Sequence, residues 1–399
     1  MNLLDYVQWR KDIKFEYDPM NELDAAVFTM ISYVNWNGIV GTTGDSHRYI
    51  TLHHAANLFQ KRKQQLGNDY QPNSSYDKNV LNLLSMIADS PRFGSVGLAY
   101  FEEKIDYDNS QQFAALTFFL LEHDIFHRTP RFVVTYRGTD NKWVGWKEDF
   151  QTFYKEKIPA QDSAEIYLKK VLSMESSTFA LAGHSKGGHL SVYSATKIGA
   201  GDQDRLQKIY SFDGLGFNFS VLDRKDFQPV EDRILHFMPE DTIVGKFFPL
   251  LGKTIVVDSE GKMFDQHNPF RWMISPNGFV EGKLSEFSKM NEKIIQSWVG
   301  EMDLEERRIL LDGLFDMLGA SNGTLKPDAT KDTLGLWKEL KNKKPELDPQ
   351  TQEVLEEKFD SLKRIVKKYI GRALKSKLPW RKKKNLKEKS ENSLDTNRD

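Results

Sequence analysis

The sequence predicts an α/β fold in which a mostly parallel sheet is flanked by helices and extended by helical additions at both ends. Strand and helix signals alternate through the middle of the chain, which is typical of a parallel sheet with crossover helices. One serine lies between glycines where an apolar strand meets a helix. The first and last parts of the chain carry mainly helical patterns. Together these observations place a sheet-edge site in the middle of the chain.

The elements follow in order from local patterns. The expected strands are 131–136, 178–182, 208–213, 233–238 and 254–258, each a short apolar run. The expected helices are 22–34 with Asn21 as its cap, 78–88, 164–174, 186–198, 284–299, 304–318 and 350–378. The chain then divides into a helical N-terminal part of the same domain (1–128), an α/β core (129–283), a C-terminal helical region (284–378) and a basic, disordered tail (379–399).

Composition excludes several classes of protein. The chain has 399 residues, of which 39% are hydrophobic and 28% charged, as in a globular protein. Its net charge of −1 argues against a protein built as a whole to bind polyanions. It has no cysteine, which excludes disulfides, thiolate metal sites and a cysteine nucleophile. No basic start precedes an apolar run, and no apolar window of about 18 residues occurs. We therefore expect a cytoplasmic protein without a signal peptide or membrane-spanning helix.

The segment Gly183-His184-Ser185-Lys186-Gly187 follows an apolar strand and opens a helix. It fits the G-x-S-x-G pattern, in which a sharp turn presents a serine Oγ above the sheet and leaves no room for bulky neighbours. The first N–H groups of the helix then face developing negative charge. Ser185 is therefore the candidate nucleophile. A tight turn with an inert serine is the alternative interpretation.

A nucleophilic serine needs a base, which in α/β-hydrolases follows the serine and the acid along the chain. His189, His236 and His267 are the histidines after Ser185. His189 is carried by the same helix as the serine and His236 lies inside a strand, so both are expected to pack. His267 lies in a polar loop after the last strand, where it can reach over the sheet edge. His267 is therefore the candidate general base, with a surface histidine as the alternative.

The acid is expected where an intermediate strand ends, because catalytic groups gather at the carboxyl edge of such sheets. The strand 233–238 ends in Pro239-Glu240-Asp241-Thr242, and Asp241 is the preferred residue, with Glu240 beside it. Asp213, at the end of the preceding strand, is a rival, and Asp258 is a weaker one. Each aspartate could instead cap a helix or close a turn.

The oxyanion hole needs two N–H donors. One is expected from the backbone of Lys186, the residue after the nucleophile. The second is expected from the loop that follows strand 131–136, where Gly138 allows close approach and Thr139 offers an N–H and a hydroxyl. Arg137 is expected to anchor this loop on a buried carboxylate. A simple strand-end turn is the alternative.

Two of these motifs carry a family resemblance. The segment 133–139 with Trp146 and Asp149 after it, and the segment 183–188, resemble the oxyanion and nucleophile elements of class 3 (fungal-type) lipases. The chain also resembles a bacterial family of lipase-like α/β-hydrolases of unknown function, mostly from Gram-positive species, over most of residues 1–315. The resemblance implies Ser185 as nucleophile, His267 as base, Asp241 as acid and Thr139 with Lys186 as oxyanion hole.

Two departures from class 3 lipases stand out. Lys186 replaces a leucine, and the cation is expected either to attract an anionic headgroup or to lie at a solvent edge. A strongly apolar lid is hard to find between Thr139 and Lys186. This weakens the expectation of interfacial triglyceride hydrolysis and leaves serine esterase chemistry intact.

The sequence therefore predicts a serine hydrolase that cleaves carboxylic esters, of a phospholipid, another acyl lipid or a smaller molecule, without metal or organic cofactor. A catalytically silent binding module is the alternative. The basic segment 372–389, which contains Trp380, is expected to be a solvated end, or else to contact an anionic membrane peripherally. Nucleic acid is the least favoured partner for it.

Overall fold

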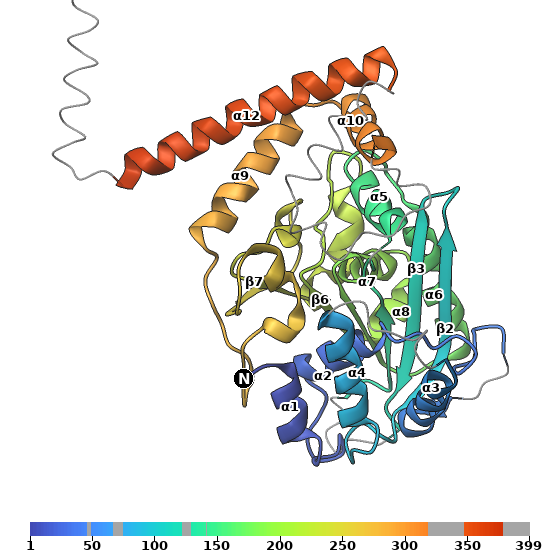
Figure 1. Ribbon diagram of the computed structural model, residues 1–399. Coiled ribbons are helices and arrows are strands. Elements are labelled where there is room, and N and C mark those ends of the chain that lie inside the picture. The colour runs from blue at the N-terminus through green and yellow to red at the C-terminus, as the bar shows by residue number, and fades with distance from the viewer. Residues whose placement is uncertain (46–48, 67–74, 122–128, 141, 318–346, 378–399) are drawn as a thin grey trace, which may run out of the picture.

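The computed structural model describes residues 1–45, 49–66, 75–121, 129–140, 142–317 and 347–377. Its centre is an eight-stranded sheet whose strands lie in chain order (Figure 1). Strands β4 to β8 are parallel, and β1 to β4 pair antiparallel. The strands are β1 (Ile50–Thr51), β2 (Gly97–Asp106), β3 (Gln111–Phe119), β4 (Phe132–Tyr136), β5 (Phe179–His184), β6 (Leu206–Phe212), β7 (Ile234–Pro239) and β8 (Lys253–Val257), with a separate ribbon of β9 (Ile274–Ser275) and β10 (Gly278–Phe279).

The five parallel strands confirm the expected strands to within two residues at each end. The hairpin of β2 and β3 was not expected, because residues 97–119 were assigned to a helical part of the chain. Residues 112–118 of β3 are all buried, so the strand shows none of the apolar–polar alternation that marks a half-exposed strand. The hairpin adds an antiparallel edge to the parallel sheet.

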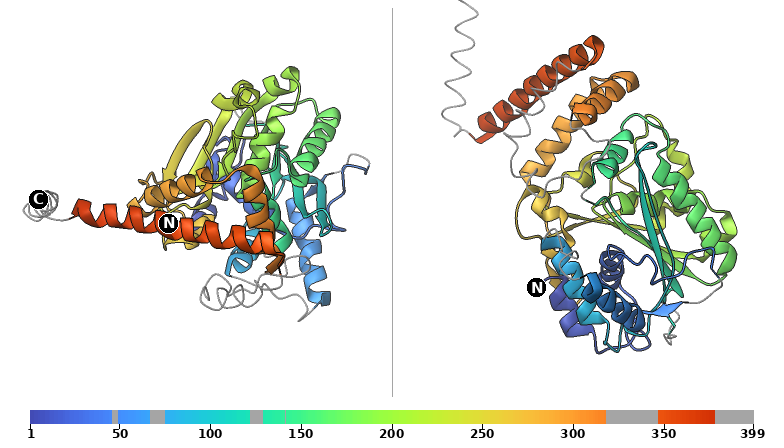
Figure 2. Two further views of the ribbon diagram at one scale, coloured as in Figure 1. Left: turned by 90° about the horizontal axis from the view of Figure 1, so that it is seen from above. Right: turned by 45° about the vertical axis from the view of Figure 1, so that its right-hand side comes forward.

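Helices cover both faces of the sheet (Figure 2). Val133 and Ala180 face the layer of α1 to α4, whereas Phe132 and Leu181 face the layer of α6 and α7. Burial on both faces explains why these strands read as continuous apolar runs. The helices are α1 (Leu3–Arg10), α2 (Glu22–Ile31), α3 (Leu52–Leu66), α4 (Ser75–Ile87), α5 (Trp143–Gln151), α6 (Pro159–Met174), α7 (Lys186–Thr196) and α8 (Ala200–Arg205), with 3₁₀ segments η2 (Arg224–Arg233), η3 (Val244–Lys246), η4 (Met263–His267) and η5 (Pro269–Arg271).

Helix α2 is fixed at its start by a buried polar network. Asn21 caps the helix, as expected, by accepting the N–H groups of the first turn. Asp24 receives two hydrogen bonds from the Arg92 guanidinium, at 2.9 and 2.5 Å, and one from the Tyr6 hydroxyl at 2.8 Å. Asp24 and Arg92 are both fully buried. The network sets the position of α2, whose C-terminal end leads into Tyr33 at the candidate site.

Replacing Arg92 by methionine is expected to lower the free energy of unfolding by about 3 kcal/mol, because Asp24 would keep a buried charge without its partner. Urea denaturation followed by tryptophan fluorescence measures this. The matched control is Arg10→Met, which removes a partly exposed ion pair to Asp18 and should cost less than about 1 kcal/mol. An equal decrease in the free energy of unfolding of the two variants would contradict the conclusion that the buried network contributes more than the partly exposed ion pair.

Among the described residues, three further helices follow the sheet: α9 (Glu286–Gly300), α10 (Leu304–Met317) and α12 (Pro349–Lys377). They confirm the helices expected in the C-terminal region, and they share a small core of Met302, Leu310, Met317 and Leu355. Helix α12 runs across α9 and α10 and extends beyond the body of the protein (Figure 1). The side chains of 372–377 and all of 378–399 lie outside the described residues, so membrane contact through the basic segment stays a prediction. The helices described here include none with the length and apolar character needed to span a bilayer.

Candidate active site

Ser185 lies at the tip of the turn between β5 and α7, and its backbone has φ 56° and ψ −127°. This conformation is strained for a residue with a side chain, and it is the geometry of a nucleophile elbow. A Cβ on Gly183 would lie 2.1 Å from the carbonyl oxygen of Gly187, and one on Gly187 would lie 2.0 Å from that of Tyr136. The glycines around Ser185 are therefore required by close backbone contacts, as the sequence pattern indicated.

His267, at the end of η4, contacts a carboxylate through its Nδ1 atom. That carboxylate belongs to Asp213, whose Oδ2 lies 2.7 Å from His267 Nδ1. The other oxygen of Asp213 accepts the hydroxyl of Thr242 at 2.6 Å. Burial acts to raise the pKa of Asp213, but the hydrogen bond and charge of His267 and the Thr242 hydroxyl hold this pKa below its usual value. Asp213 is therefore an ionised, buried partner that orients His267.

Asp241, the acid preferred from the sequence, does not contact His267. Its Oδ2 accepts the backbone N–H of Met263 at 3.4 Å, and its own N–H donates to Gln266. The physical reason is strand order: Asp213 follows β6, which pairs directly with β5 and its serine, whereas Asp241 follows β7, one strand further away. The carboxylate that contacts His267 is thus that of the rival Asp213, one strand earlier than the preferred Asp241.

The other acidic alternatives also lie apart from His267. Glu240 accepts the backbone N–H of Lys283, and the backbone N–H of Asp258 bonds to the Val280 carbonyl. One signal for Asp213 was present in the sequence, since it stands before Gly214 at a strand end. In the structure Asp213 has a φ of 44°, a tight turn that aims its side chain along the sheet edge.

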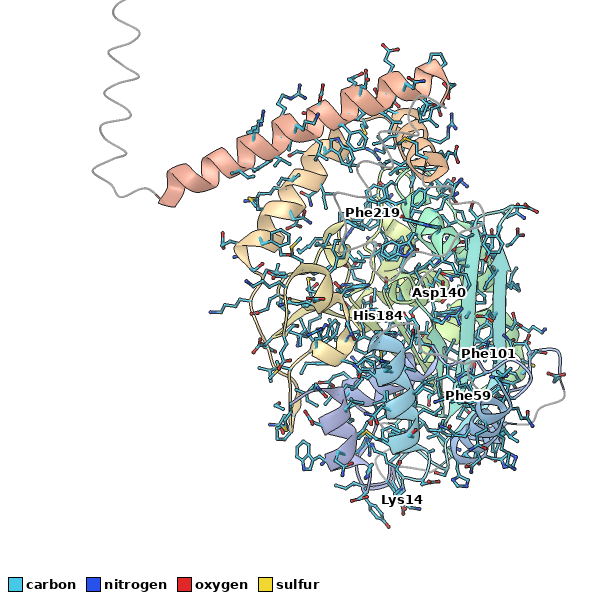
Figure 3. All side chains as sticks on the ribbon, viewed as in Figure 1. Lys14, Phe59, Phe101, Asp140, His184 and Phe219 are labelled. Carbon is cyan, nitrogen blue, oxygen red and sulfur yellow. The ribbon has the colours of Figure 1, made fainter. Side chains whose placement is uncertain are left out.

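His184, the residue before the nucleophile (labelled in Figure 3), contacts both the loop of His267 and Tyr33. Its Nε2 lies 2.7 Å from the carbonyl oxygen of His267, and the two imidazole rings are 4.5 Å apart between centroids. A carbonyl only accepts, so Nε2 carries the hydrogen and Nδ1 accepts from the Tyr33 hydroxyl at 2.9 Å. Burial, and then the nearby His267, lower the pKa of His184 to about 3. His184 is thus a neutral link between the nucleophile turn and the loop of His267.

Ser185 and His267 belong to different elements, and the His267 carbonyl oxygen is bound by His184, the residue before the serine. In the part of the chain that is described, Ser185 Oγ and His267 Nε2 form no hydrogen bond with each other. Such catalytic bonds are often long in a free enzyme and shorten when substrate binds. The side chain of His267 is 21% exposed, so it is only partly buried.

The two other histidines after the serine are buried, as expected. His189 accepts from the Gln161 amide and donates to the Gly216 carbonyl, which fixes its ring inside the core. His236 lies within β7. Burial lowers the pKa of each histidine to about 4. Among the described residues neither ring forms a hydrogen bond with Ser185, whereas His267 is held beside the nucleophile turn by the contact of its carbonyl oxygen with His184 Nε2.

The loop after β4 lies against the nucleophile turn. A Cβ on Gly138 would meet the His184 carbonyl oxygen at 2.5 Å and the Ser185 Cβ at 3.1 Å. The Gly138 N–H donates to the Tyr33 hydroxyl, so it is already paired. Arg137 forms an ion pair with Glu103 at 2.6 Å, as expected for an anchor of this loop. The loop therefore carries Thr139 to the edge of the sheet next to Ser185.

Lys186 is buried, with 1% of its surface exposed. Its Nζ lies 2.8 Å from Glu148 and 3.6 Å from Asp149, two consecutive residues of α5. Neither expected role, an exposed attractor of headgroups or a solvent-edge lysine, fits this position. As the first residue of α7, Lys186 has a backbone N–H without an intrahelical acceptor, which keeps that N–H available to a ligand.

An apolar cleft opens at Ser185, and α5 supplies much of its wall. Its cavity volume is about 10 Å³, which is about the space of one water molecule. Residues of α9 and α10, Val299 and Leu311, pack on the aromatic cluster behind it. The cleft is lined by Trp146, Asp149, Phe150, Phe153, Ser185, Leu215, Val244 and Phe247.

The chemistry of the site is that of a serine, an imidazole and a carboxylate beside free backbone N–H groups. Within the described ranges, no cluster of three or more histidine, aspartate or glutamate side chains is arranged to hold a metal ion. The arrangement can deprotonate a serine, transfer an acyl group to it and stabilise an oxyanion.

Comparison with known proteins gives a family and a distant structural likeness. The profile of a lipase-like family described as Mbeg1-like matches residues 87–316. A solved structure of the Rhizomucor miehei lipase propeptide complex is similar at 12% identity with a TM-score of 0.30, over 62% of this chain and 75% of that one. No curated protein sequence matches the chain.

Proposed function

The chain belongs to the lipase-like Mbeg1-like family, and from this premise we propose that it is a serine hydrolase that cleaves carboxylic esters through an acyl-serine intermediate. The observation that carries the proposal is the contact of Asp213 with His267 at 2.7 Å, beside a serine held in a strained strand-to-helix turn. A strained backbone costs free energy, and it persists at sites where the geometry serves function. A merely structural turn would need neither the strain nor the buried carboxylate–imidazole pair.

In the proposed reaction Ser185 Oγ attacks the ester carbonyl carbon while His267 Nε2 takes the serine proton. The imidazolium that forms is stabilised by Asp213, which accepts the hydrogen on Nδ1. His267 then returns the proton to the alcohol oxygen as the ester bond breaks. Water attacks the acyl-serine in the second half-reaction, with His267 again as base, and frees the acid.

The negative charge on the carbonyl oxygen would be met by the backbone N–H groups of Lys186 and Thr139. The first is the free donor at the start of α7, where the helix dipole adds to its effect. The second lies on the loop that Gly138 allows to approach the serine. Donors fixed before the reaction are the largest single contribution in many acyl-transfer enzymes.

The cleft beside Ser185 favours an apolar acyl group as the part of the substrate that it receives. Its walls are aromatic and aliphatic apart from Asp149 and Ser185. Because its cavity volume is about 10 Å³, a short acyl group such as acetyl requires the least displacement of the walls. A longer chain requires the aromatic walls to separate. We therefore propose esters of short acyl groups as the first substrates to test.

A fluorophosphonate probe tests the proposal directly, because it reacts with serines activated in this manner. The expected result is one covalent adduct on the full-length protein by intact mass spectrometry, and no adduct on Ser185→Ala. Ser177→Ala, at an exposed serine, is the matched control and should label as fully as the unmodified protein. Equal labelling of the Ser185→Ala variant would refute Ser185 as nucleophile, and no labelling of any form would favour the silent binding module.

A further inference from the structure

The side chain of Lys186 joins the two halves of the proposed oxyanion hole. Lys186 supplies one backbone donor, and its Nζ contacts Glu148 and Asp149. Asp149 in turn accepts the hydroxyl of Thr139, the residue that supplies the second donor. A chain of contacts therefore runs from one donor to the other through a buried lysine and a buried aspartate.

The carboxylates of Glu148 and Asp149 differ in how many hydrogen bonds they accept. Glu148 accepts the backbone N–H of Gln112 at 2.9 Å and that of Ala160 at 2.7 Å, in addition to Lys186. Asp149 uses Oδ2 for Thr139, and its buried Oδ1 has no hydrogen-bond partner among the described residues. The ionised form of Asp149 thus depends mainly on the charge of Lys186 and on the Thr139 hydroxyl.

The charges within the group are unbalanced, with one cation for two carboxylates. Burial raises the pKa of Asp149 to about 6, and Glu148 adds to the rise, whereas Lys186 and the Thr139 hydroxyl oppose it. Asp140 is a further charged group near Lys186, and its carboxylate is paired with Lys142. Asp149 is therefore poised to change its charge near neutral pH.

The charge on Asp149 decides how Thr139 is held. An ionised carboxylate only accepts, so it fixes the Thr139 hydroxyl as donor and with it the loop that carries the Thr139 N–H. A protonated Asp149 can donate instead, which leaves the Thr139 hydroxyl hydrogen without a fixed direction. A charge-assisted hydrogen bond is also roughly twice as strong as a neutral one.

We propose that the Lys186 ammonium is a positioning residue that keeps Asp149 ionised, so that Asp149 holds Thr139 in the geometry that stabilises the oxyanion. The proposal rests on the proposed hydrolase function for its effect on rate, but the Lys186–Asp149 coupling can be measured without activity. Because Lys186 acts through Asp149, removing its charge should change kcat more than KM.

Lys186→Met and Glu148→Gln should act in opposite directions on Asp149, because one removes the cation and the other removes the competing anion. The direct measurement is the ¹³C resonance of the Asp149 carboxyl carbon in aspartate-labelled protein, identified by its loss in Asp149→Asn. Its titration midpoint is expected to rise by roughly one pH unit in Lys186→Met and to fall in Glu148→Gln. Shifts in the same direction, or no shift in either variant, would overturn the proposal even if a variant is less stable.

Hydrolysis of p-nitrophenyl acetate between pH 5 and pH 9 gives the second measurement. In Lys186→Met the acid limb of the kcat profile is expected to move to higher pH by about the same amount, with kcat lowered about twofold at pH 7 and about fivefold at pH 6, and with KM within about twofold. The difference between each variant and the unmodified protein at the same pH reports the contribution of Asp149. Shifted carboxyl midpoints in a protein without hydrolysis would retain the coupling and reject the hydrolase. Hydrolysis with an unmoved acid limb would reject the positioning role.

Discussion

Replacing Ser185 by alanine is expected to lower kcat for p-nitrophenyl acetate by about 10³-fold or more, because only binding and oxyanion stabilisation would remain. His267→Ala should be nearly as inactive. The double variant should be little worse than either single one, since nucleophile and base act as a unit. Stopped-flow or steady-state release of p-nitrophenol measures all three, and circular dichroism shows that the fold is retained.

The histidines inside the core provide the comparison for this prediction. His189 and His236 are buried among apolar residues and strands, so alanine at either position should lower stability more than turnover per folded molecule. High activity in His267→Ala, together with its loss in a folded His189→Ala or His236→Ala protein, would require a different base.

Asp213→Asn is expected to lower kcat by about 10³- to 10⁴-fold while the fold is kept. The asparagine amide can donate to His267 Nδ1, which would place the hydrogen on Nε2 and leave no base facing Ser185. It would also remove the charge that stabilises the imidazolium. The measurement is kcat at pH 8 for both proteins.

Asp241→Asn is the matched control for this second prediction, since Asp241 also follows a strand of the sheet, but its carboxylate accepts the backbone N–H of Met263 and its own N–H donates to the Gln266 side chain, both in η4. Its kcat should stay within about threefold of the original value. The reverse outcome, with Asp241→Asn inactive and Asp213→Asn active, would restore the acid that the sequence favoured.

The sequence predicted the parts of the site that depend on local pattern. The residues that form the turn at Ser185 are consecutive in the sequence, and the loops of Thr139 and His267 follow strands that the sequence pattern predicts. To predict which carboxylate contacts His267, one must know which strands are neighbours. Asp213 and Asp241 follow two strands with similar sequences, and only the pairing of β5 with β6 distinguishes the two residues. That pairing depends on tertiary packing rather than on local propensity.

The environment of Lys186 could not be predicted for a related reason. A lysine on a helix next to glycines looks exposed, because burying a charge without a partner is costly. Its partners, Glu148 and Asp149, lie almost 40 residues earlier in the chain and face it only after α5 packs against α7. The β2–β3 hairpin was not predicted, because residues 112–118 of β3 are all buried and do not alternate between apolar and polar side chains.

Tyr33 connects the site to a part of the chain that the family profile does not reach. The profile begins at residue 87, yet the Tyr33 hydroxyl contacts His184 and Gly138, one on each side of the serine. Helices α1 to α4 also cover one apolar face of the sheet. In effect the first 86 residues behave as a covalently attached subunit of the part that carries the site. A fragment that begins at residue 87 would expose that sheet face and leave His184 Nδ1 and the Gly138 N–H without the Tyr33 hydroxyl, so we expect a folded unit with this site to include α1 to α4.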